Sequence, residues 1–228
     1  MTIIAVFAAA RLVEGDIVED RRRNAVSCFF CKWSKYRDRV WVPVYISSSY
    51  SSSQKRVIRS AMKQIQDQTC IWFYEIYGWS RWYTRHLYIF SGNGCWSYIG
   101  RIWWTRQQKL SLSKNGCLRT GTIQHELLHA LGFAHEHSRS DRDDYIQVLT
   151  NNINPGEERN FAKYKTNNLR TPYDFKSVMQ YSNFAFSKNG LPTLVSRSNP
   201  SMRFGFAPSV SSNDILRVNR YYQCTAYL

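Results

Sequence analysis

The stretch that decides the fold reads His125-Glu126-Leu127-Leu128-His129-Ala130-Leu131-Gly132-Phe133-Ala134-His135. His125 and His129 are four positions apart, so a helix places both imidazoles on one face, one turn apart. Gly132 lets the chain turn sharply after the helix, so that His135 can return toward the same point. Three protein ligands suit a tetrahedral zinc ion that keeps one position open to water, as a catalytic site requires.

Glu126 adjoins the first histidine and is expected to face the water molecule and not the metal itself. A zinc ion lowers the pKa of its water to about 7, so a neighbouring carboxylate can act as general base and pass the proton to a leaving amine. The simpler alternative is a helix that carries ordinary surface or core histidines. The glycine and the third histidine favour the zinc site, because they extend the short HExxH pattern.

A second element lies downstream, in the segment Ser177-Val178-Met179-Gln180-Tyr181. Met179 in a tight turn could form a soft apolar floor under the histidines. Tyr181 could reach the metal or hydrogen-bond an oxyanion. Either residue could equally be an ordinary core residue, so the segment gains weight only from the zinc motif before it.

The composition limits the class of protein. The chain has 228 residues, enough for one domain or for two lobes that share a cleft. The net charge of +15 permits nucleic-acid binding, attraction to an acidic extracellular substrate, or simple solubility. No nucleic-acid recognition motif is present, and no apolar run is long enough to span a bilayer. The short apolar stretch Ile3–Ala10 resembles a truncated targeting segment.

Six cysteines at wide spacings favour three disulfides and an oxidising compartment, because only Cys28 and Cys31 form a CxxC pair. Hydrophobic periodicity predicts the following strands and helices. The expected strands are 40–46, 71–76, 86–90 and 110–112. The expected helices are one after the serine-rich turn 47–53, one over 122–131 and one over 213–222. Ser211 and Asp214 have the spacing of a capping box at the start of the last helix, with Asp in the usual Glu place.

The run His125–Arg142 and the SVMQY segment resemble the astacin family of metzincin metallopeptidases, and the resemblance extends from about Glu14 to Cys224. It implies a secreted, monomeric zinc endopeptidase. The implied fold is α+β and two-lobed, with a twisted mixed sheet and the active-site helix in the N-terminal lobe. The C-terminal lobe would be irregular, with one terminal helix.

The resemblance also implies roles for single residues. Tyr181 would ligate zinc at rest and stabilise the transition state, and Glu136 would anchor the new N-terminus after activation. Disulfides would join Cys70 to Cys224, Cys95 to Cys117 and Cys28 to Cys31. Gln180 stands where the family usually has His, which we expect to have a small effect because that position is not a ligand.

The N-terminal segment resembles a propeptide. Within Glu14-Gly15-Asp16, Asp16 would occupy the position of the zinc-bound water and keep the chain inactive; the alternative is an ordinary loop acid. Cleavage by a trypsin-like protease after Arg23 would leave Asn24 as the mature N-terminus. Residues 1–23 would then be the propeptide remnant and 24–228 the catalytic domain, with lobes of about 24–136 and 137–228.

Within the family, Arg23-Asn24-Ala25 and the early cysteine pair look most like fish hatching enzymes, which degrade egg-envelope proteins of the zona-pellucida type. This implies secretion, with storage in granules as one route. Trp103-Trp104 stand where many relatives have Gly-Gly, in what the resemblance implies is the strand that pairs with substrate. The competing hypotheses are a protease with another extracellular substrate and a non-catalytic secreted binding protein that keeps the fold.

Overall fold

The computed structural model describes residues 12–18 and 31–228 of the chain. The apolar stretch Ile3–Ala10, the expected cleavage point at Arg23 and Asn24, and Cys28 of the expected Cys28–Cys31 bridge lie outside these residues.

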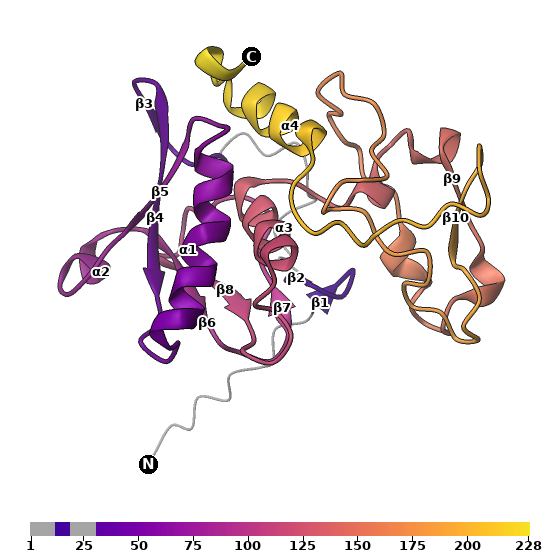
Figure 1. Ribbon diagram of the computed structural model, residues 1–228, viewed down its shortest axis with the longest axis horizontal. Coiled ribbons are helices and arrows are strands. Elements are labelled where there is room, and N and C mark those ends of the chain that lie inside the picture. Colours follow the sequence, from indigo (N-terminus) through magenta and orange to yellow (C-terminus); the bar gives the residue numbers. More distant parts are fainter. Residues whose placement is uncertain (1–11, 19–30) are drawn as a thin grey trace.

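A twisted, mixed six-stranded sheet forms the first half of the molecule (Figure 1). Strand β4 pairs in parallel with β5 and β6, β6 pairs in parallel with β8, and β3 and β7 add antiparallel partners. The central strands alternate buried Val, Ile and Leu with partly exposed aromatic residues, as expected for a sheet that has one face in the core. Their bounds are β3 Lys35–Tyr36, β4 Arg39–Ile46, β5 Ile71–Glu75, β6 His86–Phe90, β7 Cys95–Trp96 and β8 Gln107–Leu112.

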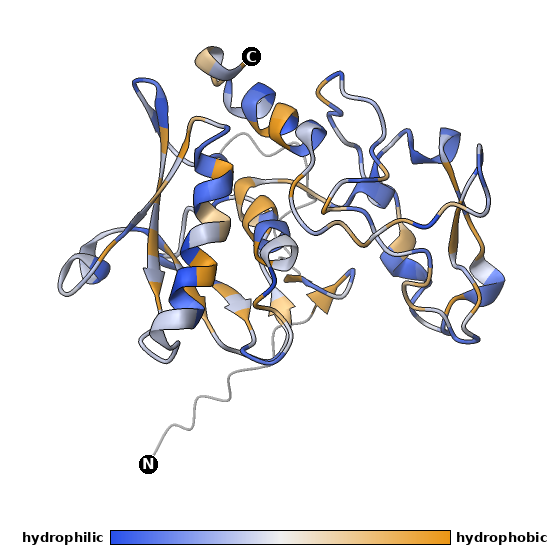
Figure 2. Ribbon diagram, viewed as in Figure 1, coloured by the Kyte–Doolittle hydropathy of each residue, from blue (hydrophilic) through white to orange (hydrophobic). Residues whose placement is uncertain are grey.

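Helix α1, Ser52–Gln66, packs against helix α3 and strand β5. Its start is fixed by a capping box, in which the Ser51 side chain and Gln54 satisfy each other's backbone N–H groups. Ile58, Ala61, Met62 and Ile65 form its buried face, and Figure 2 shows this apolar stripe beside hydrophilic turns. The amphipathic pattern therefore positions α1 as a cover for α3.

Helix α3, Thr120–Leu131, is buried along most of its length, because it packs against α1 and against strands β7 and β8 of the sheet. Gly132 ends it in the left-handed conformation, with φ of 111°. The left-handed conformation favours glycine, and a Cβ at this position would lie 3.3 Å from the ring of Tyr221, which would have to shift slightly.

The second half, coloured orange in Figure 1, contains little regular structure. A two-stranded antiparallel sheet joins β9, Ile146–Val148, to β10, Leu194–Ser196. The second half has a small core of its own, the second core, which consists of Ile146, Ile153, Phe161, Tyr173, Tyr181, Leu194 and Phe204. The remaining short elements are helix α2 Ser80–Tyr83, the 3-10 turns Glu136–Ser138, Arg142–Asp144, Thr150–Asn152, Glu158–Phe161 and Thr225–Tyr227, and strands β1 Leu12–Val13 and β2 Ile17–Val18.

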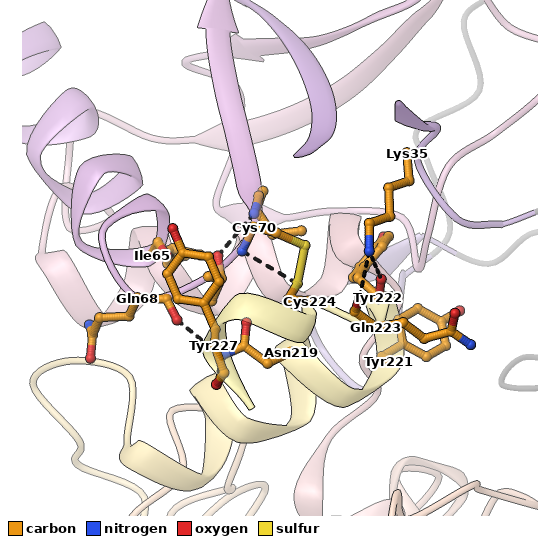
Figure 3. Close-up of a disulfide and its surroundings, with 12 residues drawn as sticks. Lys35, Ile65, Gln68, Cys70, Asn219, Tyr221, Tyr222, Gln223, Cys224 and Tyr227 are labelled. Atoms are coloured by element: carbon orange, nitrogen blue, oxygen red, sulfur yellow. Dashed lines mark hydrogen bonds between the residues drawn. A yellow bond between two sulfur atoms is a disulfide. The ribbon is translucent and has the colours of Figure 1, made fainter. Parts of the chain in front are cut away.

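Helix α4, Ser212–Tyr222, brings the end of the chain back to the first half. The expected capping box is present, with Asp214 in the third helical position after Ser211. A disulfide joins Cys70 to Cys224, and Figure 3 shows α4 held beside it by Asn219, whose amide donates to the carbonyl of Gln68 at 3.0 Å. The second described disulfide joins Cys95 to Cys117.

The expected elements are present, with ends that move by a few residues. The strand expected over 110–112 begins at Gln107, and the helix expected over 122–131 begins at Thr120. The Trp103-Trp104 segment is not a strand: both indoles are exposed in a bend before β8. Residues 103–107 show no alternation of buried and exposed side chains, so nothing fixes an extended strand there.

Candidate metal centre and active site

Helix α3 supplies the first three residues of the site. His125, Glu126 and His129 lie on its last turns, and Glu126 and His129 are almost completely buried. The turn at Gly132 brings His135 into the same place, with 1% of its surface exposed. The three imidazole rings lie 4.6–5.1 Å apart between centroids. The helical spacing and the glycine turn therefore act together, as the sequence predicts.

Asp16 joins the three histidines from a distant part of the chain. One carboxylate oxygen, Oδ2, lies 3.1 Å from Nε2 of His125 and 3.3 Å from Nε2 of His135. The other oxygen lies 3.8 Å from Nε2 of His129. One potential ligand atom from each of the four residues lies within 4.8 Å of the others.

The opposite ring nitrogens of the two helical histidines are held by backbone carbonyls. Nδ1 of His125 lies 2.7 Å from the carbonyl oxygen of Val178, and Nδ1 of His129 lies 2.7 Å from that of Phe133. A carbonyl oxygen can only accept, so each Nδ1 donates its N–H, and each Nε2 faces the centre as the nitrogen that would bind a metal. The fold thus selects the tautomer that binds metal.

Charge and burial oppose each other in this cluster. Burial lowers the pKa of His129 well below its usual value, which keeps the ring neutral. Burial would also lower the pKa of His135, but the adjacent carboxylates of Asp16 and Glu14 raise it to about 10. Burial would raise the pKa of Asp16, whereas His135 and His125 hold it well below its usual value. Without a metal, a proton on His135 balances these carboxylates, and a metal cation would displace it.

Burial raises the pKa of Glu126 well above its usual value, and the neighbouring Asp16 carboxylate raises it further. Oε2 of Glu126 is buried and has no hydrogen-bond partner among the described residues. The same holds for Nε2 of His129 and Oδ1 of Asp16, which lie 3.8 Å apart. Buried polar atoms are normally paired, and this donor set of imidazole nitrogens and a carboxylate oxygen fits a zinc ion.

Tyr181 lies beside the cluster, and Met179 is hydrogen-bonded to the residue that follows His135. Met179 is 2% exposed, packs in the main core, and its carbonyl oxygen accepts from the backbone N–H of Glu136 at 2.8 Å. The Tyr181 ring lies 4.6 Å from that of His135, and its hydroxyl donates to the carbonyl oxygen of Glu14. The tyrosine hydroxyl is therefore bound to the N-terminal segment in this state.

Glu136 is buried in an ion-pair network and faces away from the cluster. The guanidinium groups of Arg217 and Arg139 both contact its carboxylate, at 2.5–2.7 Å and 3.2 Å, and the backbone N–H of Asp174 donates to it at 2.7 Å. Gln180, at the position where the resemblance leads one to expect His, accepts from the hydroxyl of Tyr173 at 2.5 Å and has a structural place in the second core.

The N-terminal segment reaches the cluster as a small antiparallel hairpin of β1 and β2, which the sequence alone does not reveal. Its backbone pairs with the edge of the sheet, since Ser97 donates to the carbonyl of Asp16 and accepts from the N–H of Val18, both at 2.9 Å. The hairpin borders a cavity of about 430 Å³ that is lined by Asp16, His125, Glu126, Gln180 and Tyr181, among others. The segment thus lies along the sheet edge at the mouth of the candidate site.

Comparison with known proteins settles the family. The sequence matches the model of the peptidase family Astacin over residues 32–223. The chain belongs to the astacin family. The fold resembles that of high choriolytic enzyme 1, described as a hatching enzyme zinc-protease from Oryzias latipes. The two structures share 40% identity and a TM-score of 0.81 over 88% of this chain and 99% of that one.

Curated astacin relatives agree with this assignment. Low choriolytic enzyme and high choriolytic enzyme 2 of Oryzias latipes are 41% and 42% identical to the chain. The alignments cover 93% of this chain and 78% and 76% of theirs. The chain is therefore an astacin metalloendopeptidase with the α+β fold expected from the sequence. Among the described residues, every helix is too short or too polar to traverse a bilayer.

Proposed function

We propose that this astacin is a secreted, zinc-dependent endopeptidase that is made as an inactive precursor. The observation that carries the proposal is the convergence of His125, His129, His135 and Asp16 on one point beside the buried carboxylate of Glu126. The three histidines would hold one zinc ion in the mature enzyme, and Asp16 would fill the remaining position in the precursor. Secretion is supported by the disulfides and by the similarity to choriolytic enzymes.

A bound zinc ion would supply Lewis acidity, which acidifies water and polarises the carbonyl of a peptide bond. Glu126 is the general base: it takes a proton from water and delivers it to the departing amine nitrogen. Its raised pKa suits this work, because a buried carboxylate holds a proton more readily than an exposed one. Tyr181 stabilises the developing negative charge once its hydroxyl is released from the carbonyl of Glu14.

Residues 1–23 form the propeptide remnant and 24–228 the catalytic domain, with lobes of about 24–136 and 137–228. A trypsin-like protease cleaves after Arg23, and the new N-terminus at Asn24 is anchored by Glu136. A cavity lined by Gly132, Glu136, Arg139 and Arg217 supports this anchor, because an ammonium group there would meet the buried carboxylate. Met179 supports the histidines from below.

The proposed substrate is a protein of the egg envelope. The observations in favour are the identity of about 40% to choriolytic enzymes along most of both chains, and a net charge of +15 that attracts acidic extracellular proteins. The enzyme acts as a monomer and is stored in secretory granules before release. It binds no nucleic acid.

The test is to mature the purified chain with trypsin, measure its zinc content, and profile the cleavage sites in egg-envelope protein and in a general proteome digest. We expect one zinc per chain and efficient cleavage of envelope protein. Cleavage of general substrates without cleavage of envelope protein would refute the hatching role. Metal-free, inactive material of native fold would refute the enzymatic role.

A further inference from the structure

The third histidine differs from the other two in what holds its outer ring nitrogen. His125 and His129 are held by the carbonyls of Val178 and Phe133, which stay in the chain after cleavage at Arg23. Nδ1 of His135 lies 2.5 Å from Oε2 of Glu14, in the segment that cleavage removes. Of the three rings, only His135 thus depends on the N-terminal segment for this partner.

Glu14 is buried and is hydrogen-bonded to the catalytic domain through both its side chain and its backbone. It is 2% exposed, its Oε1 accepts from the hydroxyl of Ser138 at 3.1 Å, and its backbone N–H donates to Oδ1 of Asn160 at 2.9 Å. The hydroxyl of Tyr181 donates to its carbonyl oxygen. Three separate segments of the catalytic domain therefore hold the backbone and the carboxylate of Glu14 in place.

The backbone of the hairpin turn places both acids of Glu14-Gly15-Asp16 on the same ring. Glu14 has φ of 54° and Gly15 has φ of 81°, so two successive residues adopt the left-handed conformation. Such a φ is uncommon for a glutamate and persists where surrounding contacts impose it. As a result, Glu14 contacts Nδ1 of His135 while Asp16 lies 3.3 Å from its Nε2. Figure 1 shows this hairpin beside α3.

We propose that Glu14 is a positioning residue that orients His135 as a metal ligand, so that the uncut chain retains zinc more tightly than Asp16 alone would allow. This rests on the proposed function, in which zinc binds the three histidines. A carboxylate that accepts from the outer N–H of a ligating histidine fixes its tautomer and raises its basicity. Removal of the segment takes away both this acceptor and the Asp16 ligand, and leaves the acceptors of the other two histidines in place.

The test is zinc affinity of the uncut chain, measured by competition with a chromophoric chelator, for wild type, Glu14→Gln, Asp16→Ala and the double variant. We expect Glu14→Gln to weaken zinc binding about 10-fold or more, as is usual for carboxylates that hold a ligating histidine. If Glu14 acts through His135, its effect persists in the Asp16→Ala background. If it serves only to seat Asp16 on the metal, the effect vanishes there, and the proposal is overturned.

A built-in control excludes misfolding. Trypsin cleavage after Arg23 converts wild type and Glu14→Gln into the same mature protein, which must bind zinc and cleave peptide equally well if the variant has folded. Cobalt(II) absorption of the uncut chains gives a second readout, because a reoriented His135 changes the ligand field. Unchanged zinc affinity in Glu14→Gln, with a normal mature product, would overturn the inference about Glu14 but not the proposed zinc endopeptidase function. Absence of zinc from the mature wild type would instead overturn the proposed function.

Discussion

The Cys70–Cys224 disulfide should contribute more to stability than the other described crosslink, because it closes the longer loop. It spans 154 residues, whereas Cys95–Cys117 spans 22. The chain-entropy relation gives about 5 kcal/mol for the first loop and about 3 kcal/mol for the second. The constant part of that relation cancels in the comparison, which leaves a difference of about 1.7 kcal/mol from loop length alone.

The perturbation is a pair of alanine substitutions at each bridge, Cys70→Ala with Cys224→Ala and Cys95→Ala with Cys117→Ala, in the uncut chain. Cys70, Cys224 and Cys117 are buried and Cys95 is partly buried, so the packing lost differs mainly at Cys95. Urea unfolding followed by tryptophan fluorescence should give the lower midpoint for the Cys70–Cys224 variant, with similar slopes. An equal or reversed order would refute the loop-length reasoning, and would mean that the contacts of α4 with Gln68 and Leu131 hold the helix without the bridge.

Further perturbations test the site and the sheet. Glu126→Gln should keep stoichiometric zinc and lose about 10²- to 10⁴-fold in kcat with a peptide substrate. Retained turnover would reject the role of Glu126 as general base. A chelator should abolish the activity of the wild type, and added zinc should restore it. Asp16→Ala in the uncut chain should raise basal peptidase activity, and unchanged latency would count against the switch. Burial lowers the pKa of His86 below 6.5, so the unfolded chain binds the proton more readily and stability should fall as pH drops below that value. In His86→Gln the loss of stability between about pH 7 and 5 should be smaller than in the wild type, as measured by urea midpoints. Equal losses in the two proteins would contradict the role of His86.

The sequence predicted the local part of the site because its signals are local. The spacing of His125 and His129 on a helix and the glycine after it depend on backbone geometry within a dozen residues. The capping box at Ser211 and the strand His86–Phe90 were predicted on the same kind of evidence, and both are confirmed.

Long-range contacts were beyond such signals. Asp16 was placed near the histidines only through the family resemblance, and Tyr181 was placed there only because its segment follows the zinc motif, since nothing in their neighbours indicates what they touch. The contact between Glu14 and His135 escaped prediction altogether, since the two residues are 121 positions apart. The one available signal was a glutamate before glycine in a short segment, which is common in ordinary turns.

Trp103-Trp104 shows the limit of transferring a strand from relatives. The pair lies in an exposed bend that is tied down by Arg85, whose guanidinium donates to the carbonyl of Trp103. Both side chains are exposed, without the alternation of a half-buried strand, and the sheet resumes only at Gln107.

The crosslink between Cys70 and Cys224 also has a bearing on biosynthesis. The histidines, Glu126, Met179 and Tyr181 all lie within the loop that it closes, and its second cysteine follows all of them in the chain. A polypeptide still emerging from the ribosome cannot complete this ring before Cys224 has been added. The covalent link between the end of α4 and the start of β5 therefore forms only after every residue of the candidate site has been translated.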